Sequence, residues 1–365
     1  MSVLEEEHQP RRSRRLRQCL RVAVSLAVAG ALFAYIFRSM ADVSEVGDAI
    51  ASMTGLELLA LGVVAVWNLA TYWMLVVAAT PGLTYPQAMV LVESTTAVAN
   101  ALPGGSAVAV GLTYTMLGSW GFSKSRSTMS VIVSGLWNSF AKLGMPVLAL
   151  ALVAVQGTIE PARVTAAVLG IVVLVGSVTV FALALCSEEF ARRAGDVAGA
   201  WATRLRAMLG KGPVEGWGHA TAKFRARTVG LVGRAWPRLT VVTLVSHFSL
   251  YLVLLVALRN IGVSNDEVPW AEVLAAFAFV RLLTAIPITP GGLGVVELGL
   301  VAALTAAGGE EASVVAAVLV FRALTYLLPI PLGLGTYAFW RRNTSWRKSA
   351  RPASTDMAGA AAAGP

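Results

Sequence analysis

The sequence predicts an all-α, polytopic integral membrane protein with inverted repeats and two hairpins that are each broken by Pro-Gly-Gly. The first observation is composition: the 365 residues are 56% hydrophobic and 13% charged, and mean hydropathy is +0.70. Soluble domains carry about 25% charged residues. The second is a series of long apolar segments, and the third is a similarity between the two halves. Collagen-like, disordered and disulfide-rich classes are excluded, and no nucleic-acid partner is expected despite the net charge of +9.

Six segments are long and apolar enough to cross the bilayer as helices, because its core needs about 20 apolar residues. They are residues 20–37, 57–80, 128–155, 162–185, 239–258 and 313–340. Two further apolar regions, 86–119 and 271–307, each contain Pro-Gly-Gly. Each region is either one re-entrant hairpin or two short spans. Both alternatives add an even number of crossings, so the topology downstream is the same.

Basic residues orient the chain. Of the 29 Lys and Arg residues, 23 fall in segments that this topology places on one side, and only Arg38, Arg163 and Arg259 fall opposite. The positive-inside rule then predicts a multi-pass protein of the cytoplasmic membrane with both termini in the cytoplasm. The alternative for the first span is a cleaved signal peptide ending near 39–41.

The predicted organisation has three parts. A basic cytoplasmic N-terminus at 1–19 precedes a transmembrane domain at 20–340, and a basic, then disordered, tail follows at 341–365. The cytoplasmic loop 187–238 is also basic, with a helical apolar stripe that includes Phe190 and Trp201. This pattern predicts a helix lying on the inner leaflet, and the alternative is a solvated helix packed on the bundle.

The two halves form a repeat, one at about 57–155 and the other at about 239–340. Pro-Gly-Gly at 103–105 matches Pro-Gly-Gly at 290–292, and Gly135–Pro146 matches Val320–Pro331. The matched spans run in opposite directions, so the repeat is inverted. Inverted repeats with broken helices are typical of secondary transporters, in which the breaks mark the substrate site. The alternative is a duplication kept only for packing.

The breaks supply the first candidate substrate-binding residues. A half-helix that begins within the membrane offers free N–H groups and a positive dipole end to an anion such as phosphate. The candidates at both breaks are Pro290, Gly291, Gly292 and Gly294 in the second half, and Asn100, Pro103, Gly104 and Gly105 in the first.

Charged residues within the predicted membrane segments are the second group of candidates, because charges there are costly and usually functional. They are Glu93, Lys142, Arg281, Glu297 and Arg322. We expect Arg281 to pair with Glu297 across the second hairpin and Glu93 to pair with Lys142. Arg322 would then be the cation that meets an anionic ligand. The alternative is that all five form structural ion pairs. No ATP-binding, metal-binding or nucleophile motif occurs, so we expect no catalytic residue, metal or cofactor.

The second break also carries a family resemblance. Arg281-Leu282-Leu283, the run from Pro287 to Glu297, Arg322 and Gly333 resemble the signature of the lysylphosphatidylglycerol synthase transmembrane, flippase-like family over residues 20–340. The resemblance implies a domain that moves or binds a lipid with a charged headgroup, such as an aminoacylated phosphatidylglycerol or a polyprenyl-phosphate-linked sugar. Only residues 341–365 follow the last predicted span. We therefore expect no aminoacyl-transferase domain and no enzymatic activity.

The predicted function is a lipid flippase or transporter for a phosphate-containing headgroup, not driven by ATP through this chain, with anionic membrane lipids as partners. One alternative is a non-transporting membrane partner or regulator of a cell-envelope glycosyltransferase or lipid-modifying enzyme. A weaker one is an integral membrane enzyme acting on a lipid phosphate.

Overall fold

The computed structural model describes residues 51, 53–102, 104–155, 161–208, 217–284 and 289–347. The predicted first span at 20–37, the basic N-terminus and most of the C-terminal tail lie outside these residues. Every element within them is helical, and four helical segments are long and apolar enough to cross a membrane: Gly55–Ala79, Lys124–Val153, Val232–Asn260 and Glu311–Arg342. The protein is therefore an all-α, multi-pass membrane protein, as the sequence predicted.

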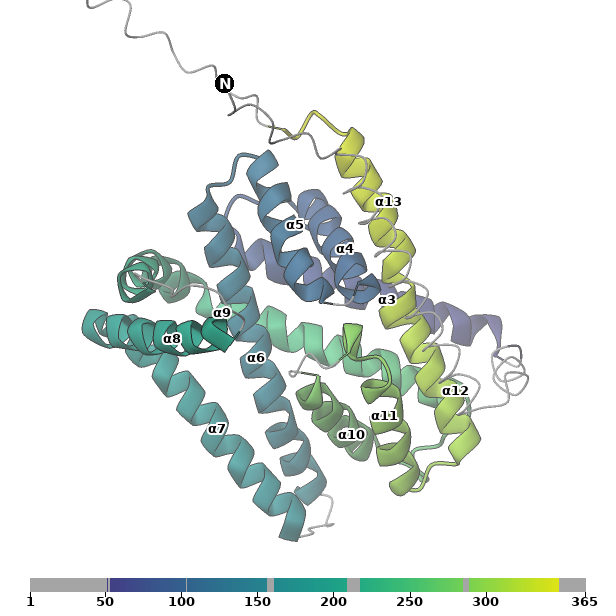
Figure 1. Cartoon of the computed structure of the whole chain (residues 1–365). Coiled ribbons are helices and arrows are strands. Elements are labelled where there is room, and N and C mark those ends of the chain that lie inside the picture. Colours follow the sequence, from purple (N-terminus) through teal and green to yellow (C-terminus); the bar gives the residue numbers. More distant parts are fainter. Residues whose placement is uncertain are drawn as a thin grey trace, which may run out of the picture.

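The helices follow the predicted order along the chain (Figure 1). The predicted first repeat corresponds to α3 (Gly55–Ala79), α4 (Tyr85–Ala101), α5 (Gly105–Ser119) and α6 (Lys124–Val155). A connecting unit comprises α7 (Pro161–Cys186), α8 (Glu188–Met208) and the first part of α9 (Trp217–Asn260). The predicted second repeat corresponds to the rest of α9, α10 (Trp270–Leu283), the 3-10 turn η1 (Pro290–Gly292), α11 (Val295–Ala306), α12 (Glu311–Arg322), the π-helical turn η2 (Ala323–Leu327) and α13 (Pro329–Arg342).

Local sequence signals explain where the first helices begin. Thr54 precedes α3, its hydroxyl accepts a hydrogen bond from the Glu57 N–H, and the Glu57 carboxylate accepts one from the Thr54 N–H. Thr84 and Gln87 repeat this arrangement at α4. Such reciprocal caps satisfy N–H groups that the first helical turn leaves free.

The two Pro-Gly-Gly regions form hairpins of short helices. α4 packs against α5, and α10 packs against α11. The last two have 14 and 12 residues, so they extend about 21 and 18 Å. Both are shorter than the about 30 Å core of a bilayer. These lengths favour re-entrant hairpins over pairs of full spans.

Helices of one predicted repeat pack against helices of the other. α3 packs against α9, α4 packs against α13, and α10 packs against α6. Each hairpin thus lies against the last helix of the other repeat. An inverted repeat related by an approximate two-fold axis predicts this exchange. Gly333 makes one of these contacts possible, because a Cβ there would overlap the Glu93 carbonyl oxygen and the Ala97 methyl group.

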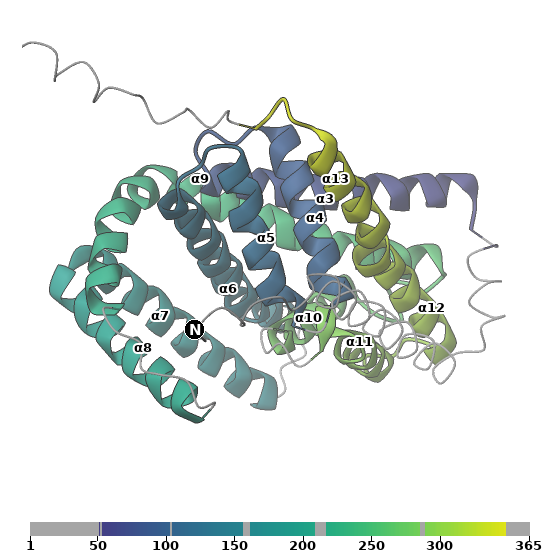
Figure 2. The same cartoon turned by 45° about the horizontal axis from the view of Figure 1, so that its top comes forward.

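The described residues of the segment 187–238 contain the predicted helix and a second helical part that was not predicted. The segment contains α8 and the first part of the 44-residue α9, which continues through Pro237 into the predicted span at 239–258. α7, α8 and this part of α9 lie together at one side of the bundle (Figure 2). Gly195 and Gly199 of α8 are buried, whereas Val197 and Trp201 are exposed by 59% and 67%. These two apolar residues of α8 therefore face away from the bundle, which favours the membrane-surface interpretation of this helix.

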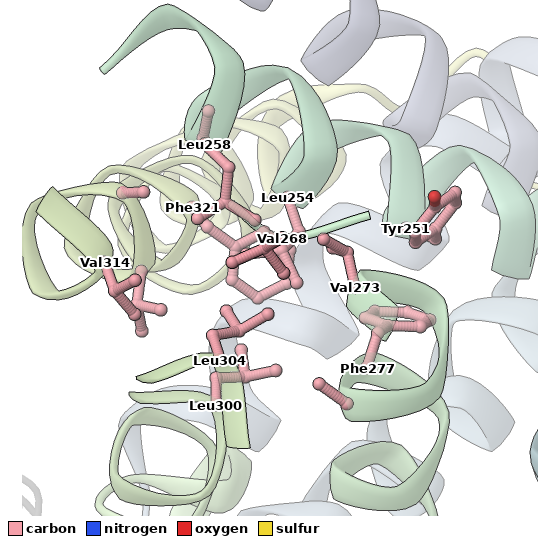
Figure 3. Close-up of a cluster of buried hydrophobic side chains, with 14 of the residues drawn as sticks. Tyr251, Leu254, Leu258, Val268, Val273, Phe277, Leu300, Leu304, Val314 and Phe321 are labelled. Carbon is pink, nitrogen blue, oxygen red and sulfur yellow. The ribbon is translucent and has the colours of Figure 1, made fainter. Parts of the chain in front are cut away.

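The largest apolar cluster among the described residues lies mainly in the predicted second repeat. Side chains of α9, α10, α11 and α12 converge there around Phe277, Leu254 and Leu304 (Figure 3). Met145 and Ala149 of α6 join this cluster. The core fixes the second hairpin against α9 and α12, and so positions the charged residues at its tip.

Candidate functional site

The tips of the two hairpins meet in the middle of the helical bundle (Figure 1). α4 contacts η1, and the Asn100 side chain lies beside Gly291. The first glycine of each Pro-Gly-Gly adopts the same left-handed conformation, with φ and ψ of 66° and 17° at Gly104 and of 57° and 18° at Gly291. Glycine adopts this conformation without the steric cost that a Cβ brings. The matched turns in the sequence are thus matched in backbone conformation.

An ion pair holds the second hairpin at its tip. The Arg322 Nε donates a 2.7 Å hydrogen bond to Glu297 Oε1, and both side chains are buried, with exposed fractions of 7% and 1%. The other carboxylate oxygen of Glu297 accepts from the Gly294 N–H at 2.8 Å. Arg322 also donates to the Gly291 carbonyl oxygen at 3.2 Å. One pair therefore joins the end of α12 to η1 and the start of α11.

This arrangement corrects the predicted pairings. Glu297 pairs with Arg322 rather than with Arg281, and Arg322 is not the free cation. Glu93 does not pair with Lys142: one of its carboxylate oxygens accepts a 2.7 Å hydrogen bond from Trp73 Nε1, and the other has no partner among the described residues. Within the same part of the chain, neither Lys142 nor Arg281 forms an ion pair. Sequence separation could not reveal this, because α12 reaches Glu297 only through tertiary packing.

Tyr326 joins the two tips. Its hydroxyl donates to the Asn100 carbonyl oxygen at 2.9 Å, and the Asn100 side-chain amide donates to the Tyr326 carbonyl oxygen at 3.1 Å. The Arg322 guanidinium lies over the Tyr326 ring, 4.5 Å from its centroid. A cation over an aromatic face is stabilised by the ring quadrupole. Tyr326 therefore connects the ion pair of the second hairpin to the end of α4.

A cavity of about 300 Å³ lies where the hairpin tips, α3 and α6 approach one another. Seven predicted site residues line it: Glu93, Asn100, Lys142, Arg281, Gly291, Gly292 and Arg322. Four other predicted site residues lie at the starts of α5 and α11 and do not line the cavity: Gly104, Gly105, Gly294 and Glu297. Pro290 is the first residue of η1. Pro103 lies outside the described residues.

Three buried polar atoms without a hydrogen-bond partner in the described part of the chain belong to residues that line this cavity. They are Glu93 Oε2, Arg281 Nε and Thr289 Oγ1. Buried polar groups in proteins are nearly always satisfied, so such a concentration marks a place where a ligand or water binds. Across the described ranges, no group of His, Cys, Asp or Glu side chains could hold a metal ion.

The sequence interpretation missed Trp73 and Tyr326. A signal for both was available, because an indole N–H or a phenol hydroxyl within an apolar helix needs a hydrogen-bond partner. Both residues lie in predicted spans, at 57–80 and 313–340. Their partners, Glu93 and Asn100, are polar residues of the first hairpin.

Comparison with known proteins gives the family. The family model described as the lysylphosphatidylglycerol synthase TM region matches residues 22–333. The chain belongs to this family. The match spans both hairpins, Lys142, the Glu297–Arg322 pair and the connecting unit between the repeats. No curated protein matches the chain significantly.

Proposed function

We propose that this member of the lysylphosphatidylglycerol synthase TM-region family moves a lipid with a phosphate-containing headgroup across the cytoplasmic membrane. The headgroup binds in the central cavity, and the chain performs no chemical reaction and hydrolyses no ATP. The observation that carries the proposal is the set of unsatisfied polar atoms of Glu93, Arg281 and Thr289 around that cavity.

The charge around the cavity favours an anion. Glu297 neutralises Arg322, which leaves Lys142 and Arg281 facing the single carboxylate of Glu93. The surplus is one positive charge, and one phosphodiester would balance it. An arginine held in an apolar protein interior needs such a partner, because an unpaired one costs about 3 kcal/mol on membrane-insertion scales.

Arg281 takes the role that the sequence interpretation gave to Arg322. Its planar guanidinium can donate two parallel hydrogen bonds to phosphate oxygens. Lys142 adds a point charge from α6, on another side of the cavity. The Glu297–Arg322 pair then serves as a scaffold that holds η1 in place.

The hairpin arrangement supports transport rather than binding alone. The cavity lies between elements of both repeats, and in transporters built from inverted repeats the substrate site lies at this interface. Movement of one hairpin and its supporting helix against the other would open the cavity to either side of the membrane in turn.

Lipid translocation in liposomes tests the proposal. Purified full-length protein is reconstituted with a panel of headgroup-labelled phospholipids, and translocation is compared for the wild type, Arg281→Gln and Lys142→Gln. We expect each variant to lower the rate at least tenfold. Arg342→Gln is the matched control, because Arg342 is an exposed arginine at the end of α13.

Two results would contradict transport. Wild-type protein that accelerates no lipid in the panel would favour the partner or regulator function. Equal rates for the wild type and both cavity variants would remove this cavity from the pathway.

A further inference from the structure

A second groove, more open than the central cavity, is lined by three arginines and no acidic residue. It has a volume of about 610 Å³ and lies between the end of α3, the start of α6 and the first part of α9. Arg126, Arg234 and Arg238 line it. All three are exposed, and among the described residues none of them forms an ion pair. A groove with three positive charges and no carboxylate is suited to a ligand with more than one negative charge.

The groove lies at a boundary of the membrane-spanning region. α3 ends at Ala79, the apolar segment of α6 begins at Lys124, and that of α9 begins at Val232. Three spans therefore reach the same level, where lipid headgroups lie. The distribution of basic residues predicts that this level is the cytoplasmic one, where basic pockets between helices bind acidic headgroups.

The floor of the groove is fixed. Thr80 and Ser130 share a 2.6 Å hydrogen bond between the end of α3 and α6, and Trp137 Nε1 donates to Thr240 Oγ1 between α6 and α9. Apolar side chains of the three helices pack beneath it: Leu75, Ala78, Ala79, Val133, Trp137, Val232 and Leu239. The arginines therefore project from a rigid base, and little conformational freedom is lost from the backbone when a ligand binds.

An apolar groove begins one helical turn beyond Arg238 on the same flank of α9. It has a volume of about 300 Å³ and is lined by Trp67 of α3 with Val241, Val245, Phe248 and Leu252 of α9. Arg234, Arg238, Val241, Val245 and Leu252 recur at intervals of three, four or seven residues, so they share one face of the helix. Val241 and Trp67 are exposed by 59% and 45%. The arginine-lined groove and the apolar groove together form one seam along α9. Its apolar part is of the kind that a lipid acyl chain covers.

We propose that this seam binds an acidic phospholipid, with a headgroup of at least two negative charges among Arg126, Arg234 and Arg238 and an acyl chain in the groove between Trp67 and Leu252. The site is separate from the central cavity and does not depend on transport. Three guanidinium groups favour a headgroup with two phosphates, because one phosphodiester would neutralise only one of them.

Lipid retention by the full chain tests this site. Purified protein in neutral detergent is titrated with cardiolipin, which carries two phosphates, and bound lipid is counted by native mass spectrometry. We expect Arg234→Gln with Arg238→Gln to weaken cardiolipin binding at least tenfold, and Arg126→Gln to weaken it less. Val245→Trp, which fills the apolar groove, should also weaken it.

Two control variants separate this site from other causes. Arg192→Gln with Arg193→Gln removes the same charge from α8, where both arginines pair with Glu189, and should retain cardiolipin. Arg342→Gln removes an exposed arginine at the end of α13, outside both the arginine-lined groove and the central cavity, and should retain cardiolipin too. Thermal unfolding of each variant establishes that it is folded.

Three results would overturn the proposal. Unchanged cardiolipin binding in the Arg234 and Arg238 double variant would remove the arginines from the site. Inorganic pyrophosphate binding as tightly as cardiolipin would show a site for soluble anions. Equal retention of phosphatidylcholine would show that the charge of the headgroup is not recognised.

Discussion

The two Pro-Gly-Gly hairpins have the same turn but are stabilised in different ways. Gly104 and Gly291 adopt nearly identical left-handed conformations. Gly291 lies against the Tyr326 ring and the Asn100 side chain, whereas no described atom lies within 4 Å of the position that a Cβ on Gly104 would take. The carboxylate of Glu297 uses both oxygens within the protein, while that of Glu93 uses one.

This difference assigns different roles to the two carboxylates. The second hairpin is held by the Glu297–Arg322 ion pair and by close packing, so these two charges serve structure, whereas Arg281 of α10 lines the cavity. The first hairpin leaves one carboxylate oxygen free towards the cavity, where Lys142 and Arg281 are also unpaired among the described residues. Two matched turns can thus keep the same backbone conformation while the carboxylate of one hairpin becomes structural and that of the other remains available to a ligand.

The largest effect is expected from Glu297→Gln. It leaves the buried Arg322 without a counter-ion, and breaking a buried pair in this way costs about 3–5 kcal/mol. The free energy of unfolding in mixed micelles measures it. Glu93→Gln is the control in the other hairpin and should cost less than about 1 kcal/mol, because glutamine still accepts from Trp73. Equal losses would mean that the two carboxylates have the same role.

A double variant sharpens this comparison. Removing both partners, as Glu297→Gln with Arg322→Met, should restore more than half of the stability lost in Glu297→Gln, because no uncompensated buried charge remains. Translocation by this variant should stay measurable if the pair is only a scaffold. Complete loss of translocation in a stable double variant would instead place Arg322 in the binding site.

A smaller effect is expected from alanine at the paired glycines. Gly104→Ala should cost about 1–2 kcal/mol, which is the penalty of a left-handed conformation for a residue with a Cβ. Gly291→Ala should cost about 1–3 kcal/mol more, because its Cβ would overlap the Tyr326 ring. Unfolding free energies of the two variants give the difference directly. Equal values would show that the crowding around Gly291 is relieved without cost.

The smallest effect is expected from Tyr326→Phe. The ring remains beneath Arg322, and only the hydrogen bond to the Asn100 carbonyl oxygen is lost. Hydrogen bonds between membrane helices contribute about 0.6 kcal/mol on average. Tyr337→Phe, at an exposed position on α13, is the matched control and should leave the unfolding free energy unchanged. A loss above about 2 kcal/mol for Tyr326→Phe, well beyond that average, would show that this contact holds the hairpins together.

Helix positions were largely predictable because they depend on local properties. Apolar segments of sufficient length predicted α3, α6, α7, the second part of α9 and the helix from α12 to α13. The Pro-Gly-Gly turns marked both hairpins, since proline and glycine interrupt helices wherever they occur in this pattern. The continuation of α9 upstream of residue 239 was missed, because its polar and basic residues resemble those of a solvated loop.

The sequence by itself determined the membrane class, the family, the two broken hairpins and the charged residues within the helical bundle, because each depends on composition, local order or a short motif. Only the tertiary structure decided which charges pair. Glu297 and Arg322 are 25 residues apart, and Trp73 and Glu93 lie on different helices. Two charges in an apolar interior can pair only when the helix faces that carry them pack together. Contacts such as α4 with α13 and α6 with α10 determine which faces do so. Arg281, rather than Arg322, is therefore the arginine left without an ion pair at the cavity among the described residues, a result of packing that no spacing along the chain could reveal.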